Sequence, residues 1–160
     1  GSMDSRPLQQ AKVELMRSLE NLDATQQFQV IFYNTQAIPL VARSRGTDMF
    51  RGNDLHRMDV ERQLEIIEAD GGTSHLNALE AALKYNADVI FFLTDADDLN
   101  LNAQQLADIT RRNNGGARIH CIEFGSSPDL SRPRTPRNSL QRFAEQNGGT
   151  YRYINVSDLR

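Results

Sequence analysis

The sequence predicts an α/β fold in which helices cover both faces of a doubly wound, mostly parallel β-sheet. Helical and strand patterns alternate along almost the whole chain, as in parallel strands joined by right-handed crossovers. Two of the strand patterns are apolar runs rich in β-branched and aromatic residues, as in buried strands. The 160 residues, of which 39% are hydrophobic, are enough for one core and too few for two comfortable domains, so we expect a single domain.

The N-terminal third predicts one helix and two strands. Ser5 offers a hydroxyl N-cap and Pro7 a first-turn proline, and apolar residues then recur at helical spacing for about four to five turns. Residues 28–33 (FQVIFY) have almost no polar break, so we expect a strand covered on both faces. Residues 37–42 predict a weaker strand, and Pro39, which has no N–H donor, favours the edge of a sheet.

Two helices and the most apolar strand follow. Residues 43–54 are polar and contain two glycines, so they predict a loop. Apolar residues at helical spacing within 60–67 and 76–83 predict a helix on each side of a glycine pair. Residues 88–94 (DVIFFLT) form the most apolar stretch of the chain, and their composition favours a fully buried parallel strand. We expect this strand at the centre of the sheet.

The last third repeats the alternation. Residues 103–109 predict a helix and residues 117–124 (ARIHCIEF) a strand. Residues 125–138 hold three prolines and three arginines and predict an irregular loop. A helix at 140–144 and a strand at 151–156 complete the predicted order.

Composition and charge exclude several classes of protein. The net charge is -3, the pI is near 5.6 and no basic stripe is present, so we expect no nucleic-acid partner. Cys121 is the only cysteine, which excludes an internal disulfide and leaves the localisation undetermined. The chain has no run of 18 apolar residues and no secretion-signal pattern, so we expect a soluble segment without a transmembrane helix.

Three carboxylates follow the most apolar strand. Asp95, Asp97 and Asp98 lie at its predicted carboxyl end, where open parallel sheets bind ligands. Their oxygens are suitable ligands for Mg²⁺ or Ca²⁺. The other interpretation is the solvated start of the next helix, where the helix dipole favours the negative charge of Asp97 or Asp98.

A glycine pair precedes the third predicted helix. Gly71 and Gly72 allow a close approach of the backbone to a ligand, and the Thr73 hydroxyl is either a metal ligand or, like that of Ser74, a helix cap. His75 is near enough in sequence to reach such a site, but we expect it on the solvated surface of the helix.

These segments together resemble the von Willebrand factor A (vWA) domain of bacterial proteins. The resemblance rests on a helix beginning RPLQQAKVELMRSL, a strand FQVIFYN, a loop ADGGT and the segment DVIFFLTDADD, and it covers essentially the whole chain. It implies a Rossmann-like fold. In that family a metal-ion-dependent adhesion site combines an Asp-x-Ser-x-Ser loop, a threonine after a glycine-rich turn and an aspartate after the fourth strand. Thr73 matches the threonine and Asp95 matches the aspartate.

The sequence departs from the family at the first motif. Family members open with a buried strand that ends in Asp-x-Ser-Gly-Ser-Met, whereas this sequence begins with Gly1-Ser2-Met3. These residues are either the end of that motif or a cloning remnant, and in both cases we expect an N-terminally truncated domain over residues 1–160. The site that the resemblance implies is reduced to the metal ligands Ser2, Thr73 and Asp95, with Gly72 and Asp97 as accessory residues. So few ligands predict weak or absent Mg²⁺ binding.

The missing first strand is central in the family's sheet, between the strands that match residues 27–33 and 89–93 here. Its absence leaves two inner edges whose backbone groups cost about 1 to 3 kcal/mol each if they are buried without partners. We therefore expect one of three outcomes. The two strands pair directly, another chain donates a strand to form a homodimer, or the domain is partly molten.

Three functions follow from these interpretations. The resemblance implies a protein-interaction domain without catalytic activity, whose divalent ion binds an acidic side chain of a protein partner. The alternative is a Mg²⁺-dependent phosphoryl-transfer or hydrolase domain that uses Asp95 and Asp97 as ligand and nucleophile, although no general base or phosphate-binding cation has a convincing place. A further alternative is a structural module with a vestigial site.

Overall fold

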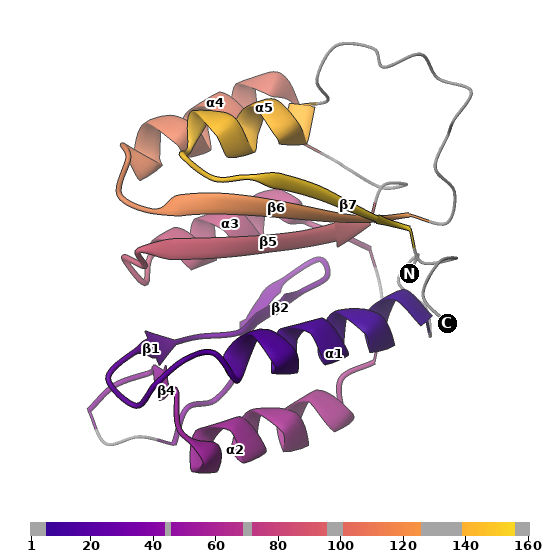
Figure 1. Cartoon of the computed structure of the whole chain (residues 1–160). Helices are drawn as coiled ribbons and strands as arrows, with labels where there is room; N and C mark the ends of the chain where they lie inside the picture. The colour runs from indigo at the N-terminus through magenta and orange to yellow at the C-terminus, as the bar shows by residue number, and fades with distance from the viewer. Residues whose placement is uncertain (1–5, 44–45, 69–71, 96–100, 126–138, 156–160) are drawn as a thin grey trace.

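The computed structural model describes residues 6–43, 46–68, 72–95, 101–125 and 139–155 (Figure 1). In chain order the elements are α1 (Arg6–Leu19), β1 (Gln27–Phe28), β2 (Ile31–Tyr33), β3 (Ala37–Pro39), β4 (Phe50–Arg51), α2 (Asp54–Glu65), α3 (His75–Leu83), β5 (Val89–Asp95), α4 (Ala103–Asn113), β6 (Arg118–Gly125), α5 (Ser139–Gln146) and β7 (Tyr151–Asn155). Among the described helices, none has the length and apolar composition needed to cross a membrane.

The parallel half of the molecule, residues 72–155, contains a three-stranded sheet in the order β5-β6-β7. Both strand pairs are parallel, and β5 is in register with β6 along its whole length. α4 connects β5 to β6, α5 connects β6 to β7, and α3 precedes β5 (Figure 1). A parallel sheet flanked by helices confirms the predicted α/β class. The buried core of this half consists of Leu79, Ile90, Phe92, Leu101, Leu106, Ile109, Ala117, Ile119, Cys121, Leu140, Phe143 and Ala144.

The antiparallel half, residues 6–68, has much shorter strands. β1 pairs with β4 and β2 pairs with β3, both antiparallel. The prediction of one doubly covered strand over residues 28–33 was wrong, because the segment divides into β1 and β2 and every residue of β2 is only half-buried. β4 lies in the segment predicted as a loop. The core of this half is a separate cluster of Leu19, Phe28, Val30, Leu40, Phe50, Val60 and Leu64.

The side chain of Gln29 explains why the predicted strand divides. Its Oε1 accepts from the N–H of Val30 at 2.7 Å, and its Nε2 donates to the carbonyl oxygens of Leu40 at 3.1 Å and Asp48 at 2.6 Å. This amide therefore occupies backbone groups that a neighbouring strand would otherwise use. Strand propensity alone does not reveal such a competition.

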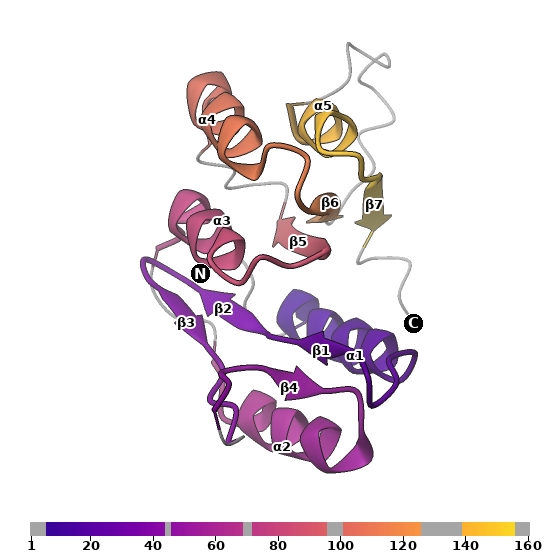
Figure 2. The ribbon, with the colours of Figure 1, turned by 90° about the vertical axis from the view of Figure 1, so that its left-hand side faces the viewer.

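β5 lies at the end of the strand order and not at the centre, so the prediction of a central strand was wrong for the described residues. Phe91 in this strand is 61% exposed, so the prediction of full burial was also wrong. Figure 2 shows β2 beyond the free edge of β5, with α3 and α1 on opposite sides. Within the described residues β2 forms a ladder with β3 alone, which excludes the direct pairing of β2 with β5 that we considered.

The side chain of Tyr33 spans the space between β2 and β5. Its hydroxyl donates to the Leu93 carbonyl oxygen at 2.7 Å, and its ring stacks on Phe92 with the centroids 5.9 Å apart. Because backbone groups alternate in direction along a strand, Leu93 and Phe91 both direct their N–H and C=O groups to this edge of β5. One of these carbonyl groups is thus satisfied by a side chain where a strand would otherwise bind.

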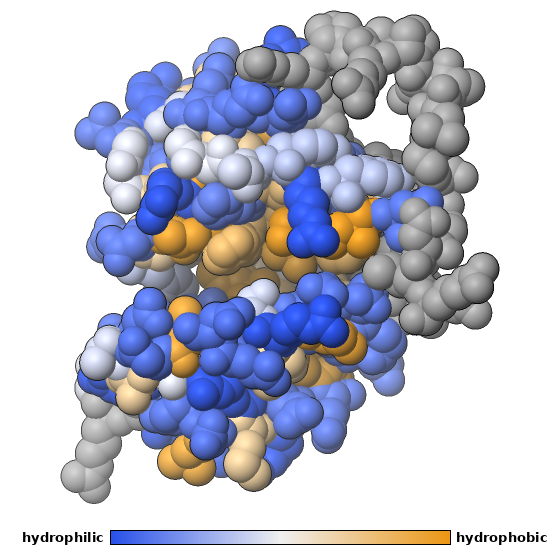
Figure 3. Space-filling view, viewed as in Figure 1, coloured by the Kyte–Doolittle hydropathy of each residue, from blue (hydrophilic) through white to orange (hydrophobic). Residues whose placement is uncertain are grey.

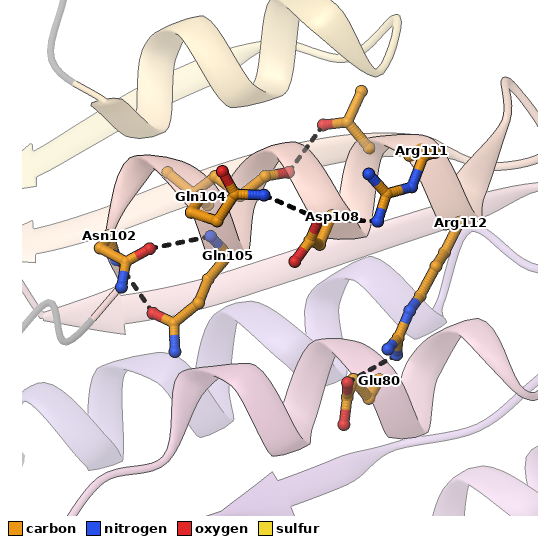
Figure 4. A network of polar contacts seen from close by, with 9 residues as sticks. Glu80, Asn102, Gln104, Gln105, Asp108, Arg111 and Arg112 are labelled. Atoms are coloured by element: carbon orange, nitrogen blue, oxygen red, sulfur yellow. Dashed lines mark hydrogen bonds and ion pairs between the residues drawn. The ribbon is translucent and has the colours of Figure 1, made fainter.

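Helix α4 is fixed at its start and along its exposed side (Figure 4). Asn102 and Gln105 form a reciprocal capping box, with bonds of 2.9 and 3.0 Å between each side chain and the other's backbone N–H. Arg112 donates to Glu80 at 2.6 Å and so connects α4 with α3. The cap positions the helix directly after the segment that follows β5.

A buried pair of asparagines joins α4, α5 and the sheet at the amino end of the strands. Asn113 Nδ2 donates to Asn147 Oδ1 at 2.8 Å, and the amide of Asn113 also bonds both backbone groups of Ala117 at 2.8 Å. Asn147 Nδ2 donates to Thr110 Oγ1 and to the Phe143 carbonyl oxygen, each at 2.9 Å. Both side chains are therefore well satisfied despite their burial.

Candidate functional site

Three of the predicted site residues lie in the described part of the chain. Thr73 is half-buried in the segment before α3, Gly72 is exposed beside it, and Asp95 is the half-buried last residue of β5. Ser2 and Asp97 lie outside the described residues. Their predicted roles as a metal ligand and as an accessory residue stay predictions.

A buried hydrogen bond joins the start of α3 to the carboxyl end of β5. His75 Nε2 and Thr94 Oγ1 are 2.8 Å apart, and both side chains are almost fully buried. Thr73 precedes His75 by two residues, and Asp95 directly follows Thr94. The bond therefore holds the two segments that carry the predicted hydroxyl and carboxylate against each other.

His75 was predicted on the solvated surface of its helix, and this prediction was wrong. The histidine shares a helix face with Ala78 and Leu79, which are buried against the sheet. The spacing of three and four residues between these positions was the signal available in the sequence. A polar residue at the first turn of that apolar face is buried together with it, and Thr94 supplies its hydrogen-bond partner.

The aromatic rings of Tyr33 on β2 and Phe92 on β5 both contact the His75 ring. Tyr33 lies edge-on to His75 at a centroid distance of 5.6 Å, and His75 lies edge-on to Phe92 at 5.9 Å. Burial raises the pKa of Tyr33, with a lesser opposite effect of a hydrogen bond to Thr94. The phenol therefore stays protonated at neutral pH and remains a donor to Leu93.

The segment that contains Thr73 is also held by the turn between β2 and β3. The N–H of Ser74 donates to the Asn34 carbonyl oxygen at 2.6 Å, and Asn77 Nδ2 donates to the Thr35 carbonyl oxygen at 3.3 Å. Ser74 is the N-cap residue of α3, but its side chain makes no capping hydrogen bond. The capping role that we considered for Ser74 is therefore wrong.

A carboxylate that we did not predict lies on the neighbouring strand. Glu123 of β6 is in register with Thr94 of β5, it is buried, and it accepts a hydrogen bond from the Tyr151 hydroxyl. Glu123 is two residues from the apolar Cys121 and so lies on the same face of the strand, which was the signal in the sequence. Burial, and secondarily the charge of Glu123, raises the pKa of the Cys121 thiol to about 12, so this cysteine is not a nucleophile at neutral pH.

The oxygen donors at this edge fit a divalent ion in kind but not in number. Thr73 supplies one hydroxyl and Asp95 one carboxylate, whereas Mg²⁺ requires six ligands in near-octahedral geometry. Among the described residues, no group of three or more His, Cys, Asp or Glu side chains is placed to hold a metal. The described residues therefore form at most part of a metal site.

Comparison with known proteins finds a similar fold but no matching sequence family. No protein-family model matches the chain, and no curated protein sequence matches it. A solved structure described as "von Willebrand factor type A from Catenulispora acidiphila" is similar to it with a TM-score of 0.78 and 21% identity. The match covers 99% of this chain and 37% of that one, so our chain spans little more than a third of the solved protein.

A second solved structure is much less similar. It is an uncharacterized membrane spanning protein from Vibrio fischeri, with a TM-score of 0.37 and 17% identity over 96% of this chain and 80% of that one, and it supports no conclusion here. The first match shows that the chain has a vWA-like fold, which agrees with the resemblance found in the sequence.

Proposed function

We propose that this chain is a protein-interaction domain without catalytic activity, which binds an acidic side chain of a protein partner at the carboxyl edge of its parallel sheet. The observation that carries the proposal is the buried bond between His75 and Thr94. It holds the Thr73 segment against the end of β5, where Asp95 lies. Ligands of open parallel sheets bind at this edge.

In this proposal a divalent ion such as Mg²⁺ lies between the domain and its partner. The Thr73 hydroxyl and the Asp95 carboxylate are its ligands from the described residues, with Ser2 as a third ligand and Asp97 as an accessory group. A methyl group added at Gly72 would meet little but the Thr35 methyl at 3.5 Å, so the backbone there is accessible. Because the ligands are few, the chain alone binds Mg²⁺ weakly and a partner carboxylate strengthens the binding.

An NMR titration tests the proposal. Backbone amide shifts of ¹⁵N-labelled protein are followed during addition of MgCl₂, first alone and then with sodium acetate as a small carboxylate ligand. We expect shifts concentrated at Thr73 and Asp95, with a millimolar apparent Kd that falls when acetate is present. Asp95→Ala and Thr73→Ala should abolish these shifts. Asp108→Ala removes a half-buried carboxylate of α4 and should preserve them.

The titration and a separate hydrolysis assay distinguish the two alternatives. The absence of any Mg²⁺-dependent shift at Thr73 and Asp95 would contradict the proposal and favour a structural module. Hydrolysis of a generic phosphate ester with Mg²⁺, lost in Asp95→Ala, would instead favour an enzyme.

A further inference from the structure

The edge of β5 that lies away from β6 carries backbone groups without strand partners. The carbonyl oxygen of Asp88, just before β5, accepts from the Arg118 N–H at 2.9 Å, so the even-numbered residues form the ladder with β6. Val89, Phe91 and Leu93 therefore direct their N–H and C=O groups to the opposite edge. The Leu93 carbonyl oxygen accepts the tyrosine hydroxyl described above, and the other groups have no hydrogen-bond partner in the part of the chain that the structure describes.

One edge of β2 faces this edge of β5. The carbonyl oxygen of Val30, just before β2, accepts from the Leu40 N–H at 2.9 Å, so the even-numbered residues pair toward β3. Ile31 and Tyr33 therefore direct their backbone groups away from β3, where no described strand pairs with them. Figure 2 shows β2 between β3 and β5, so these groups point toward β5. We call the backbone edges at Ile31 and Tyr33 of β2 and at 89, 91 and 93 of β5 the facing edges.

The separation of the facing edges fits one further strand. Paired strands lie about 4.8 Å apart, and β2 and β5 form no ladder with each other. The Tyr33 side chain nevertheless reaches from β2 to the Leu93 carbonyl oxygen, with 2.7 Å between the two oxygens. A tyrosine side chain with a hydrogen bond at its end spans about two strand spacings, or roughly 10 Å. A single strand fits this separation, whereas β2 and its neighbours exclude the whole sheet of a second copy.

The side chains beside the facing edges are mainly apolar. Phe91 is exposed although it lies in the middle of β5, and its ring stacks on His120 with the centroids 5.1 Å apart. Phe92 points to the opposite face of the strand and is buried. Figure 3 shows apolar side chains along the boundary between the two halves of the molecule. A strand with apolar neighbours on both faces is itself apolar on both faces.

We propose that the facing edges bind an extended apolar peptide segment that is not part of residues 1–160. The segment adds a strand to β5, and its backbone pairs with the groups of both edges, as in other cases of β-strand addition. The apolar runs of residues 1–160 already form the described strands and helices, which leaves none of them to fill this position. β5 has seven residues, so a segment of about that length suffices. This binding is independent of the metal and of the carboxyl edge.

Tyr33 competes with the added strand for one backbone group. Its hydroxyl occupies the Leu93 carbonyl oxygen, so an incoming segment must replace that hydrogen bond. Tyr33→Phe removes the competitor and keeps the ring on Phe92. We therefore expect this variant to bind the segment about threefold to tenfold more tightly, which corresponds to one hydrogen bond. An affinity that falls would contradict this role of the hydroxyl.

Fluorescence anisotropy of a labelled peptide, Lys-Thr-Val-Ile-Val-Thr-Lys, tests the proposal with the whole chain. EDTA in the buffer removes any metal-dependent binding at the carboxyl edge, so the result does not depend on the proposed function. We expect saturable binding. The control peptide is N-methylated at its isoleucine and one valine, which removes a donor from each of its edges and keeps the side chains, and it should bind at least tenfold more weakly. Equal binding of both peptides, or no binding at protein concentrations up to about 1 mM, would overturn the proposal.

Two substitutions at one position separate backbone pairing from apolar contact. Phe91→Pro removes the N–H at the facing edge and spares the ladder with β6, because proline is tolerated in a strand where its N–H is not needed. It should weaken binding of the first peptide at least tenfold. Phe91→Ala keeps the N–H and should stay within about threefold. Equal losses in both variants would overturn the proposal, because the peptide would then bind the apolar surface alone.

Hydrogen exchange of the unmodified chain with the first peptide gives a measurement that requires no variant. We expect slower exchange at the amides of Phe91 and Leu93 and at that of Ile31, which all face the added strand. The amide of Ile90 already lies in the ladder with β6 and should change little. Protection confined to other surfaces of the molecule would overturn the proposal.

Discussion

The parallel and antiparallel halves of this molecule differ in how their strands satisfy backbone groups. In the parallel half, β5 and β6 pair over seven registered positions and β6 and β7 over five. In the antiparallel half the longest ladder, between β2 and β3, has three. There the Gln29 side chain binds backbone groups where a strand would otherwise pair, and the Tyr33 hydroxyl binds a carbonyl group at the edge of β5 in the other half. The comparison shows that strand pairing satisfies most backbone groups of the parallel sheet. In the antiparallel half, side chains satisfy backbone groups that the short strands leave unpaired.

The largest expected effect concerns the close packing of the parallel half. A methyl group at Gly149 would overlap the carbonyl oxygen of Ile119 on β6. Gly149→Ala should therefore lower the free energy of unfolding by about 3 kcal/mol, since neither backbone can move without breaking the sheet. Gly115→Ala is the control, because a methyl group there meets nothing within 4 Å and only the positive φ of 71° is unfavourable, at about 1 kcal/mol. Urea denaturation measures both, and equal losses would contradict the packing argument.

Removing the buried asparagine contact should also affect the parallel half strongly. Asn147→Ala deletes three side-chain hydrogen bonds and leaves the buried Asn113 amide without one of its partners. We expect a loss of about 2 to 3 kcal/mol in urea denaturation. Asn77→Ala, which removes one exposed bond of 3.3 Å to Thr35, should cost less than about 0.5 kcal/mol. A loss for Asn147→Ala as small as that would show that water replaces the network.

Tyr33→Phe tests the contact between the two halves. It removes the hydroxyl that donates to the Leu93 carbonyl oxygen and keeps the ring on Phe92. We expect a loss of about 1 to 2 kcal/mol, together with faster hydrogen exchange at the free edge of β5. Tyr85→Phe is a matched control, and its effect should be small. Unchanged exchange in the β5 amides of Tyr33→Phe would contradict the proposed role of the hydroxyl.

The pH dependence of stability gives a second measurement on Tyr33. Burial raises its pKa above the ordinary value of 10.0, so the folded protein retains this proton at a pH where the unfolded chain loses it. The resulting stabilisation is complete below about pH 10 and declines as the pH rises further. Cys121 behaves alike from its ordinary value of 9.0, because burial raises its pKa to about 12. Tyr33→Phe should keep the cysteine part of the decline and lose the tyrosine part.

The smallest effect is expected at the exposed ion pair between α3 and α4. Arg112 contacts Glu80 at 2.6 Å, but the arginine side chain is largely exposed, so solvent screens the attraction. Arg112→Ala should change the free energy of unfolding by at most about 1 kcal/mol, and less in high salt. A larger loss that salt does not reduce would show that the arginine contributes through packing.

Sequence patterns predicted the parallel half closely and the antiparallel half poorly. Residues 88–94, 103–109 and 117–124 were predicted with the correct type, and the structure extends each by at most a few residues. One error in the antiparallel half was to treat residues 28–33 as one strand, because the Gln29 side chain competes there with strand pairing. The predicted helix over 60–67 begins earlier, at Asp54, where Asn53 accepts from the His56 N–H.

The candidate site was predicted only in part. The sequence selected Thr73 and Asp95 from a glycine-rich turn and a strand end, and the structure connects their segments through His75 and Thr94. It did not select Glu123, since a single acidic residue in an apolar strand carries no motif. The metal-binding role of these residues is a prediction that the titration will decide.

The sequence by itself determined the α/β class and the elements of the parallel half, because helical and strand periodicity depend on neighbours a few residues apart. The tertiary structure decided which edge of β5 has no strand partner among the described residues, why His75 is buried and what Tyr33 binds. The partners of His75 and Tyr33 lie 19 and 60 residues away in the chain. Local pattern contains no information about such contacts, because the packing of whole elements brings them together.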